Sequence, residues 1–85
     1  MASREKRLEA IRAHPKQVRF AALRSALVAY GFSVRPGKGD HWSFTHPLLP
    51  LPVGVDPRRP FILRVYVKNA LQAIDEVRAK MGENG

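Results

Sequence analysis

Apolar residues recur with helical spacing along one central segment of the chain. They fall three or four positions apart, at Phe20, Leu23, Leu27 and Tyr30. This spacing places the four side chains on one face of a helix. Gly31 follows, where a glycine in the left-handed conformation commonly ends a helix. The pattern therefore predicts an amphipathic helix that stops at this residue.

Two further helices are predicted nearer the ends of the chain. The segment from Ser3 to Ala13 is mostly polar, but Leu8 and Ile11 lie three positions apart in it. His14-Pro15 ends this segment, because the residue before a proline avoids helical angles. A last helix up to Gly82 is predicted from apolar residues at Val67, Leu71, Ile74, Val77 and Met81.

Between these helices, apolar and polar residues alternate, which is typical of β-strands. Residues 32–35 and 41–45 alternate with a period of two, and PGKGD at 36–40 supplies a turn between them, so we predict a β-hairpin. One face of a short third strand would carry Leu51, Val53 and Val55. Residues 61–66 fit either a strand or the approach to the last helix.

The predicted order of two helices, three strands and a final helix is that of a two-layer α+β fold. Helices that cover one face of an antiparallel sheet leave the other face in water. Alternation then assigns each strand side chain to one face. The side chains expected toward the helices are Phe32, Val34, Trp42, Phe44, Leu51, Val53 and Val55. Those expected on the open face are Ser33, Arg35, His41, Ser43 and Thr45.

The chain is strongly basic. Its 85 residues include 15 Lys+Arg and 7 Asp+Glu, a formal net charge of +8, and between Ile11 and Ile74 the only acidic residues are Asp40 and Asp56. Such a charge attracts a polyanion such as nucleic acid, although an anionic membrane or an acidic protein would also be attracted. With 45% hydrophobic and 26% charged residues, the composition is that of one soluble folded domain.

Two absences in the sequence favour a cytoplasmic protein. The chain has no cysteine, which excludes disulfides and suits a reducing compartment. No apolar run approaches the ~20 residues of a membrane span, and the segment MASREKRLEA is charged where a signal peptide would be apolar. We therefore expect a cytoplasmic location without membrane association.

His41 is the residue that offers the clearest chemistry. It is expected on the open face, beside a glycine-flanked turn with Arg35 and Lys38. An imidazole there could act as a general base or acid toward a ribose 2′-hydroxyl while the two cations hold the phosphate. The simpler interpretation is a polar surface side chain. His14 and His46 add no metal site, because His41 and His46 would point to opposite faces of a strand, and no metal or other cofactor is expected.

Several short motifs, taken in order, resemble the HicA family of bacterial toxins. They are a helix ending in AYGF, the turn GKGDH, the loop HPLLP and the final segment RVYVKNALQAIDEV, and the likeness covers residues 18–78. HicA proteins are small messenger-RNA interferases with a fold similar to a double-stranded RNA-binding domain, α-β-β-β-α. The resemblance thus implies a HicA-like domain over residues 18–81, a polar helical extension over residues 1–17 and a disordered tail over residues 82–85.

The same resemblance implies roles for individual residues. His41 takes the position of the single catalytic histidine and Gly39 that of the turn glycine, while Asp40 stands where the family most often has serine and places a negative charge near the RNA. The expected RNA contacts come from Arg35, Lys38, Gly39 and Ser43. The implied protein is a metal-independent endoribonuclease, monomeric when free, whose partners are messenger RNA and a HicB-like antitoxin that covers the active face.

Two other functions fit the same basic surface. One is a non-catalytic module that binds RNA or DNA and in which His41 only donates or accepts hydrogen bonds. The other is an interaction protein whose basic face docks an acidic partner. Cleavage of RNA by the pure protein would separate the toxin from both, and nucleic-acid affinity at moderate salt would separate the two from each other.

Overall fold

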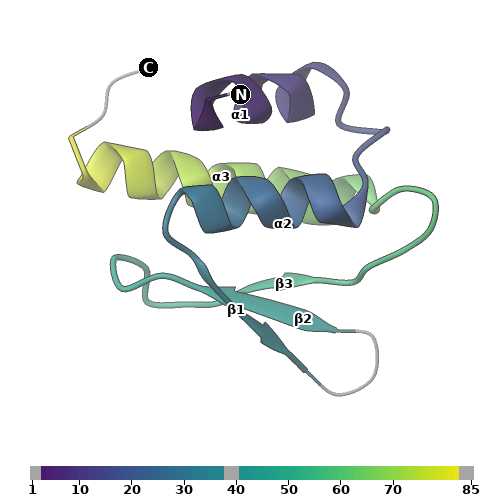
Figure 1. Cartoon of the computed structure of the whole chain (residues 1–85). Helices are drawn as coiled ribbons and strands as arrows, with labels where there is room; N and C mark the ends of the chain where they lie inside the picture. The colour runs from purple at the N-terminus through teal and green to yellow at the C-terminus, as the bar shows by residue number, and fades with distance from the viewer. Residues whose placement is uncertain (1–2, 38–40, 83–85) are drawn as a thin grey trace.

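The computed structural model describes residues 3–37 and 41–82 and contains the elements in the predicted order (Figure 1). They are α1 (Arg4–Ala13), α2 (Phe20–Ala29), β1 (Ser33–Pro36), β2 (Trp42–Thr45), β3 (Val53–Val55) and α3 (Arg64–Lys80). The α+β class and the predicted hairpin are therefore confirmed. Residues 61–63 continue no strand and lead into α3. The predicted tail at 82–85 falls mostly outside the described residues.

The end of α2 is set by a glycine, as the sequence predicts. Gly31 has a φ of +93°, in the left-handed region that favours glycine. Its N–H donates to the carbonyl of Val28 at 3.0 Å, and the N–H of Phe32 donates to the carbonyl of Leu27 at 3.1 Å. This pair of hydrogen bonds is a Schellman motif, which satisfies the last carbonyls of the helix and turns the chain directly into β1.

The three strands form one antiparallel sheet in the order β1-β2-β3, so β2 is the central strand. Val34 pairs with Phe44 and Arg35 with Ser43 across β1 and β2. Paired residues in an antiparallel sheet share a face. Because Phe44 is fully buried, Val34 lies on the helix side, whereas Arg35 and Ser43 lie on the open side.

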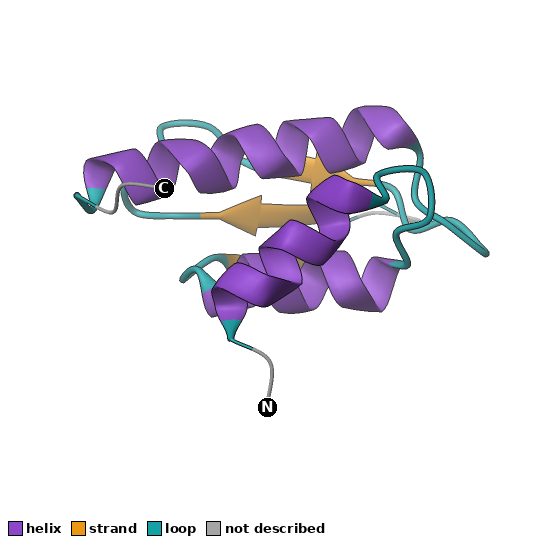
Figure 2. Cartoon of the chain, turned by 90° about the horizontal axis from the view of Figure 1, so that it is seen from above, coloured by secondary structure: helices purple, strands orange, loops and turns teal. Residues whose placement is uncertain are grey.

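The helices pack in two levels on the same side of the sheet (Figures 1 and 2). The helix α2 packs on β1 and α3 packs on β3, and α1 crosses both helices on the side away from the strands. Leu8 and Ile11 of α1 are buried in the same hydrophobic core as the strand residues. The segment expected as a polar extension of a two-layer domain is therefore a third layer that closes the core from outside.

Polar contacts hold α1 on the other two helices. The guanidinium of Arg7 donates to the Ser25 hydroxyl of α2 at 3.2 Å, and Arg12 forms an ion pair with Asp75 of α3. The Ser3 hydroxyl caps the start of α1 by accepting from the backbone N–H of Lys6.

Nothing among the described residues has both the length and the apolar character of a membrane-spanning helix.

Several residues predicted for the core are more exposed than expected, and Phe20, Val34 and Leu71 are among those that are only partly buried. Leu51 is 75% exposed because β3 begins only at Val53, after a proline that ends the loop. Met81 lies beyond the last turn of α3 and is 46% exposed. Trp42 does face the helix side, but it is only half-buried, since it stands at the end of β2 beside the edge strand.

Replacement of Phe44 should show how far stability depends on the central strand. Phe44→Ala removes a fully buried ring and should lower the free energy of unfolding by about 3–5 kcal/mol. Its neighbour Thr45 points the other way, and Thr45→Ala should cost about 1 kcal/mol or less. Urea denaturation of the two variants measures both values, and equal losses would contradict the register.

Candidate active site

The mouth of the hairpin fixes the backbone of His41. The N–H of Gly37 donates to the carbonyl oxygen of His41 at 2.6 Å, one residue beyond the last strand pair, Pro36 with Trp42. A Cβ at position 37 would lie 2.9 Å from that same oxygen, so the contact requires glycine. The three residues between them, Lys38, Gly39 and Asp40, lie outside the described residues.

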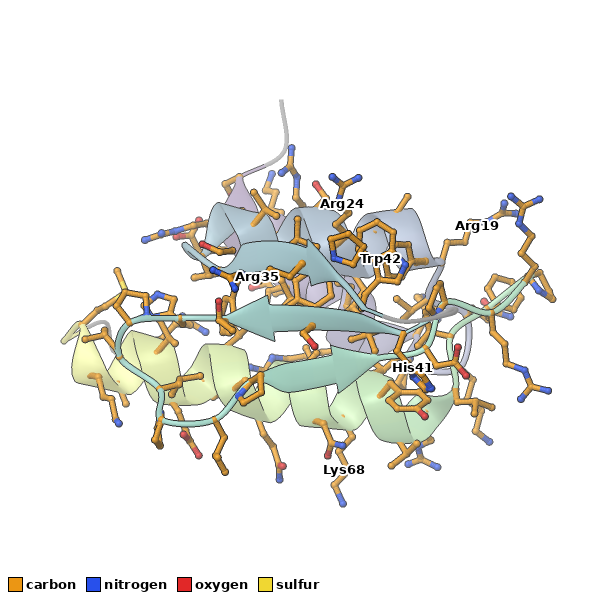
Figure 3. The ribbon with its side chains drawn as sticks, turned by 90° about the horizontal axis from the view of Figure 1, so that it is seen from below. Arg19, Arg24, Arg35, His41, Trp42 and Lys68 are labelled. Atoms are coloured by element: carbon orange, nitrogen blue, oxygen red, sulfur yellow. The ribbon has the colours of Figure 1, made fainter. Side chains whose placement is uncertain are left out.

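The side chain of His41 is exposed at one end of the sheet. Figure 3 views the open face and shows Arg35 on the same face, directed toward the other end of the sheet. Ser43 is paired directly with Arg35 and lies two residues after His41 in the chain. The structure therefore brings the predicted residues Arg35, His41 and Ser43 onto one face, but Arg35 and His41 are not arranged around a single point.

A carboxylate that the sequence did not single out, Asp56, follows directly after the last residue of β3, the strand paired with β2. Trp42 is paired with Val55, and Asp56 follows Val55 as His41 precedes Trp42. Continuing the antiparallel register by one residue places Asp56 opposite His41. Between these two described side chains there is no hydrogen bond, and Asp56 is half-buried. Only the pairing of β2 with β3 reveals this neighbour, because 15 positions separate the two in the chain.

Basic side chains surround the open face from both helices. Figure 3 shows Arg24 on the α2 side and Lys68 on the α3 side, with Arg19 beyond the His41 end of the sheet. All three are exposed, and among the described residues none of them pairs with a carboxylate. Together with Arg35 they give the face the positive potential that attracts a polyanion. The helical cations cannot be assigned to this face from the sequence alone, because their orientation depends on how the helices lie on the sheet.

His46 has a structural role and not a chemical one. Its Nδ1 accepts a hydrogen bond from the backbone N–H of Leu48 at 3.0 Å, and its Nε2 lies 3.2 Å from the carbonyl oxygen of Tyr30. A backbone N–H can only donate, so Nδ1 carries no proton and Nε2 donates to Tyr30. The ring also contacts Phe32 edge-on, with centroids 5.0 Å apart. His46 thus joins the loop after β2 to the end of α2.

The two histidines that flank β2 therefore differ in burial and in hydrogen bonding. His46 is half-buried with both ring nitrogens engaged, whereas His41 faces solvent at the other end of the strand. His14 is exposed at the end of α1. Within the described ranges, no three His, Cys, Asp or Glu side chains come together as metal ligands. The site can therefore offer an accessible imidazole and surrounding cations, with the Asp56 carboxylate just beyond the end of the paired strand β3.

No family model, curated protein or solved structure matches this chain.

Stability measurements should separate the two histidines. His46→Ala leaves the Leu48 N–H and the Tyr30 carbonyl without this partner, and should lower the free energy of unfolding by about 1–3 kcal/mol. His41→Ala should change it by less than about 0.5 kcal/mol, because that side chain is exposed. Chemical denaturation compares them, and a large loss in the His41 variant would show that His41 also supports the fold.

Proposed function

We propose that this protein is a metal-independent endoribonuclease that cleaves messenger RNA, the toxin of a HicA-type toxin-antitoxin pair. The observation that carries the proposal is the exposed imidazole of His41, held by its backbone at the mouth of the hairpin on a basic sheet face. Further support comes from the order of the motifs that resemble the HicA family and from the order α2, β1, β2, β3, α3, which agrees with the α-β-β-β-α order that this resemblance implies.

The proposed reaction uses the ribose 2′-hydroxyl as the nucleophile. His41 takes the proton of this hydroxyl, and the 2′-oxygen attacks the adjacent phosphorus. The bond from phosphorus to the 5′-oxygen breaks, which leaves a 2′,3′-cyclic phosphate on one fragment and a 5′-hydroxyl on the other. Solvent supplies the proton to the leaving oxygen and takes the proton from His41. Nearby cations stabilise the charge that develops on the phosphate.

Asp56 and Arg35 have separate roles in this proposal. We place Asp56 opposite His41 by extending the β2–β3 register one residue beyond Trp42 and Val55, and its carboxylate would then stabilise the imidazolium that forms during proton transfer. Arg35 points toward the other end of the face, so it binds a phosphate next to the one that is cleaved. The RNA strand would then lie along β2 with Ser43 beneath it.

The proposed partner is a HicB-like antitoxin that covers the open face. Because the cations there have no described carboxylate partners, such an antitoxin would contribute acidic side chains opposite Arg35, Arg24 and Lys68. Covering this face would block His41 and the RNA-binding surface together. The proposed location of both proteins is the cytoplasm.

One observation favours a second candidate, a nucleic-acid-binding module without catalysis. No hydrogen bond from a described residue orients the His41 imidazole. Catalytic histidines are commonly oriented by a hydrogen bond to the other ring nitrogen. In this alternative, the basic face binds RNA and His41 contributes only to the surface.

Replacement of His41 tests the catalytic proposal. Pure wild-type protein should cleave messenger RNA in the presence of EDTA, and His41→Ala should lower the rate at least about 100-fold while staying folded, because a general base typically contributes that factor or more. His14→Ala is the matched control and should cleave at the wild-type rate. It removes another exposed histidine, the C-cap residue of α1, and α1 lies on the side of the other helices away from the strands. Mass spectrometry of the fragments should find 2′,3′-cyclic phosphate ends.

The outcomes decide between the two candidates. Equal cleavage by wild type and His41→Ala would reject His41 as the catalyst. Tight RNA binding by the wild type without any cleavage would favour the non-catalytic module. Loss of cleavage in EDTA would contradict the metal-independent mechanism.

Removal of Arg35 tests the binding face separately from the chemistry. Arg35→Gln should reduce the slope of log affinity against log salt by about 0.7 for single-stranded RNA, which corresponds to one lost phosphate contact. Lys6→Gln, on α1 at the far side of the molecule, should leave the slope unchanged. Filter binding at several salt concentrations gives both values. If Arg35→Gln kept the wild-type slope, the RNA would not contact this side chain.

A further inference from the structure

A partly exposed tryptophan with aromatic and cationic neighbours lies at the β1 edge of the sheet. The Trp42 ring contacts Phe20 of α2, with centroids 5.4 Å apart and planes tilted by 54°. The guanidinium carbon of Arg24 lies 5.9 Å from the centre of the indole. We call Trp42, Phe20 and Arg24 the aromatic edge. Figure 3 shows Trp42 and Arg24 side by side at the border of α2 and the sheet.

The position of Trp42 on its strand explains its exposure. Phe44, two residues along on the same side of β2, is fully buried and also contacts Phe20. Trp42 is the first residue of β2 and is paired with Pro36, the exposed last residue of the edge strand β1. The indole therefore rests on Phe20 and keeps part of its surface in water. A large ring in this state can still gain contact area from a ligand.

The cations at this edge are available to a phosphate. Arg24 is exposed and has no described carboxylate partner, and at 5.9 Å its attraction to the indole is near the limit of such contacts. Arg19, also exposed, lies 5.9 Å above the ring of Phe61. A flexible arginine over an aromatic ring can turn to a phosphate without breaking an ion pair. The edge therefore combines a stacking surface with unneutralised positive charge.

We propose that the aromatic edge is a nucleotide-binding subsite in which one unpaired RNA base stacks on Trp42 while Arg24 binds the neighbouring phosphate. As a substrate subsite it rests on the proposed function. His41 and Trp42 are consecutive and point to opposite sides of β2. An RNA strand that passes over the hairpin mouth has its cleaved phosphate at His41 and an adjacent base at Trp42. Only an unpaired base can turn onto the indole, so the substrate at this site is single-stranded.

The sequence provides a direct probe, because Trp42 is the only tryptophan. Its fluorescence should be quenched when an eight-nucleotide single-stranded RNA with 2′-O-methyl groups, which block cleavage, is added. The same strand in a perfect duplex and inorganic polyphosphate should bind with little quenching, because neither offers an unpaired base. Quenching of equal extent by polyphosphate would overturn the proposal.

Variants separate stacking from charge. Trp42→Leu should weaken binding of the single strand by about 5- to 150-fold, the loss typical of one stacked base, and should leave polyphosphate binding unchanged. Arg24→Gln should weaken both ligands, and Lys6→Gln serves as the control on the far side. Circular dichroism confirms folding of each variant. If Trp42→Leu does not fold, the quenching experiment on the wild type still decides.

The results distinguish this proposal from the catalytic one. Selective quenching by the single strand, in a protein that cleaves no RNA, supports the subsite and rejects the nuclease. Two results together would reject the subsite: RNA leaves the fluorescence of the wild type unchanged, and Trp42→Leu binds the single strand with full affinity. If cleavage still depends on His41, the nuclease proposal remains intact.

Discussion

The burial of Phe44 between the central strand and the helices is the constraint on which the rest of the structure depends. Its ring has no exposed surface and contacts Phe20 of α2, so the face of β2 that carries it must meet the helix layer. With a period of two, this single choice sends Ser43 and its partner Arg35 to the other face. A slip of one residue would bury polar groups and expose the ring. The direction of His41 follows from the same choice.

The two ends of the central strand carry histidines in different states: His46, after the strand, is hydrogen-bonded, and His41, before it, is exposed. After β2, His46 uses both ring nitrogens to hold the loop to the end of α2. The ammonium of Lys80 also reaches this loop and donates to the carbonyl of Leu48 at 3.0 Å. Before β2, the only described backbone bond of the hairpin mouth is that from Gly37 to His41. Side-chain hydrogen bonds therefore fix the loop after β2, whereas the His41 imidazole before β2 and the cations around it are exposed to solvent.

Much of the fold could be predicted from the sequence because its signals are local. Gly31 ends α2 through its own backbone angles, and the alternation of apolar residues defines the hairpin. The covering of one sheet face by helices could also be predicted, but the place of α1 could not. Only the packing shows that α1 closes the core through Leu8 and Ile11. For the candidate site, alternation along the strands was enough to predict the open face, but the position of Asp56 after the end of β3 becomes relevant only through the pairing of β2 with β3.

The two edges of the sheet have a consequence for association. A strand edge with free backbone groups is a template for another strand, and proteins that keep such edges short or place proline and charge on them resist edge-to-edge aggregation. Here β3 has three residues, and β1 has four and ends in Arg35 and Pro36. Proline cannot donate a hydrogen bond to an added strand. The chain can therefore keep a broad wet sheet face without growing into strand-paired aggregates.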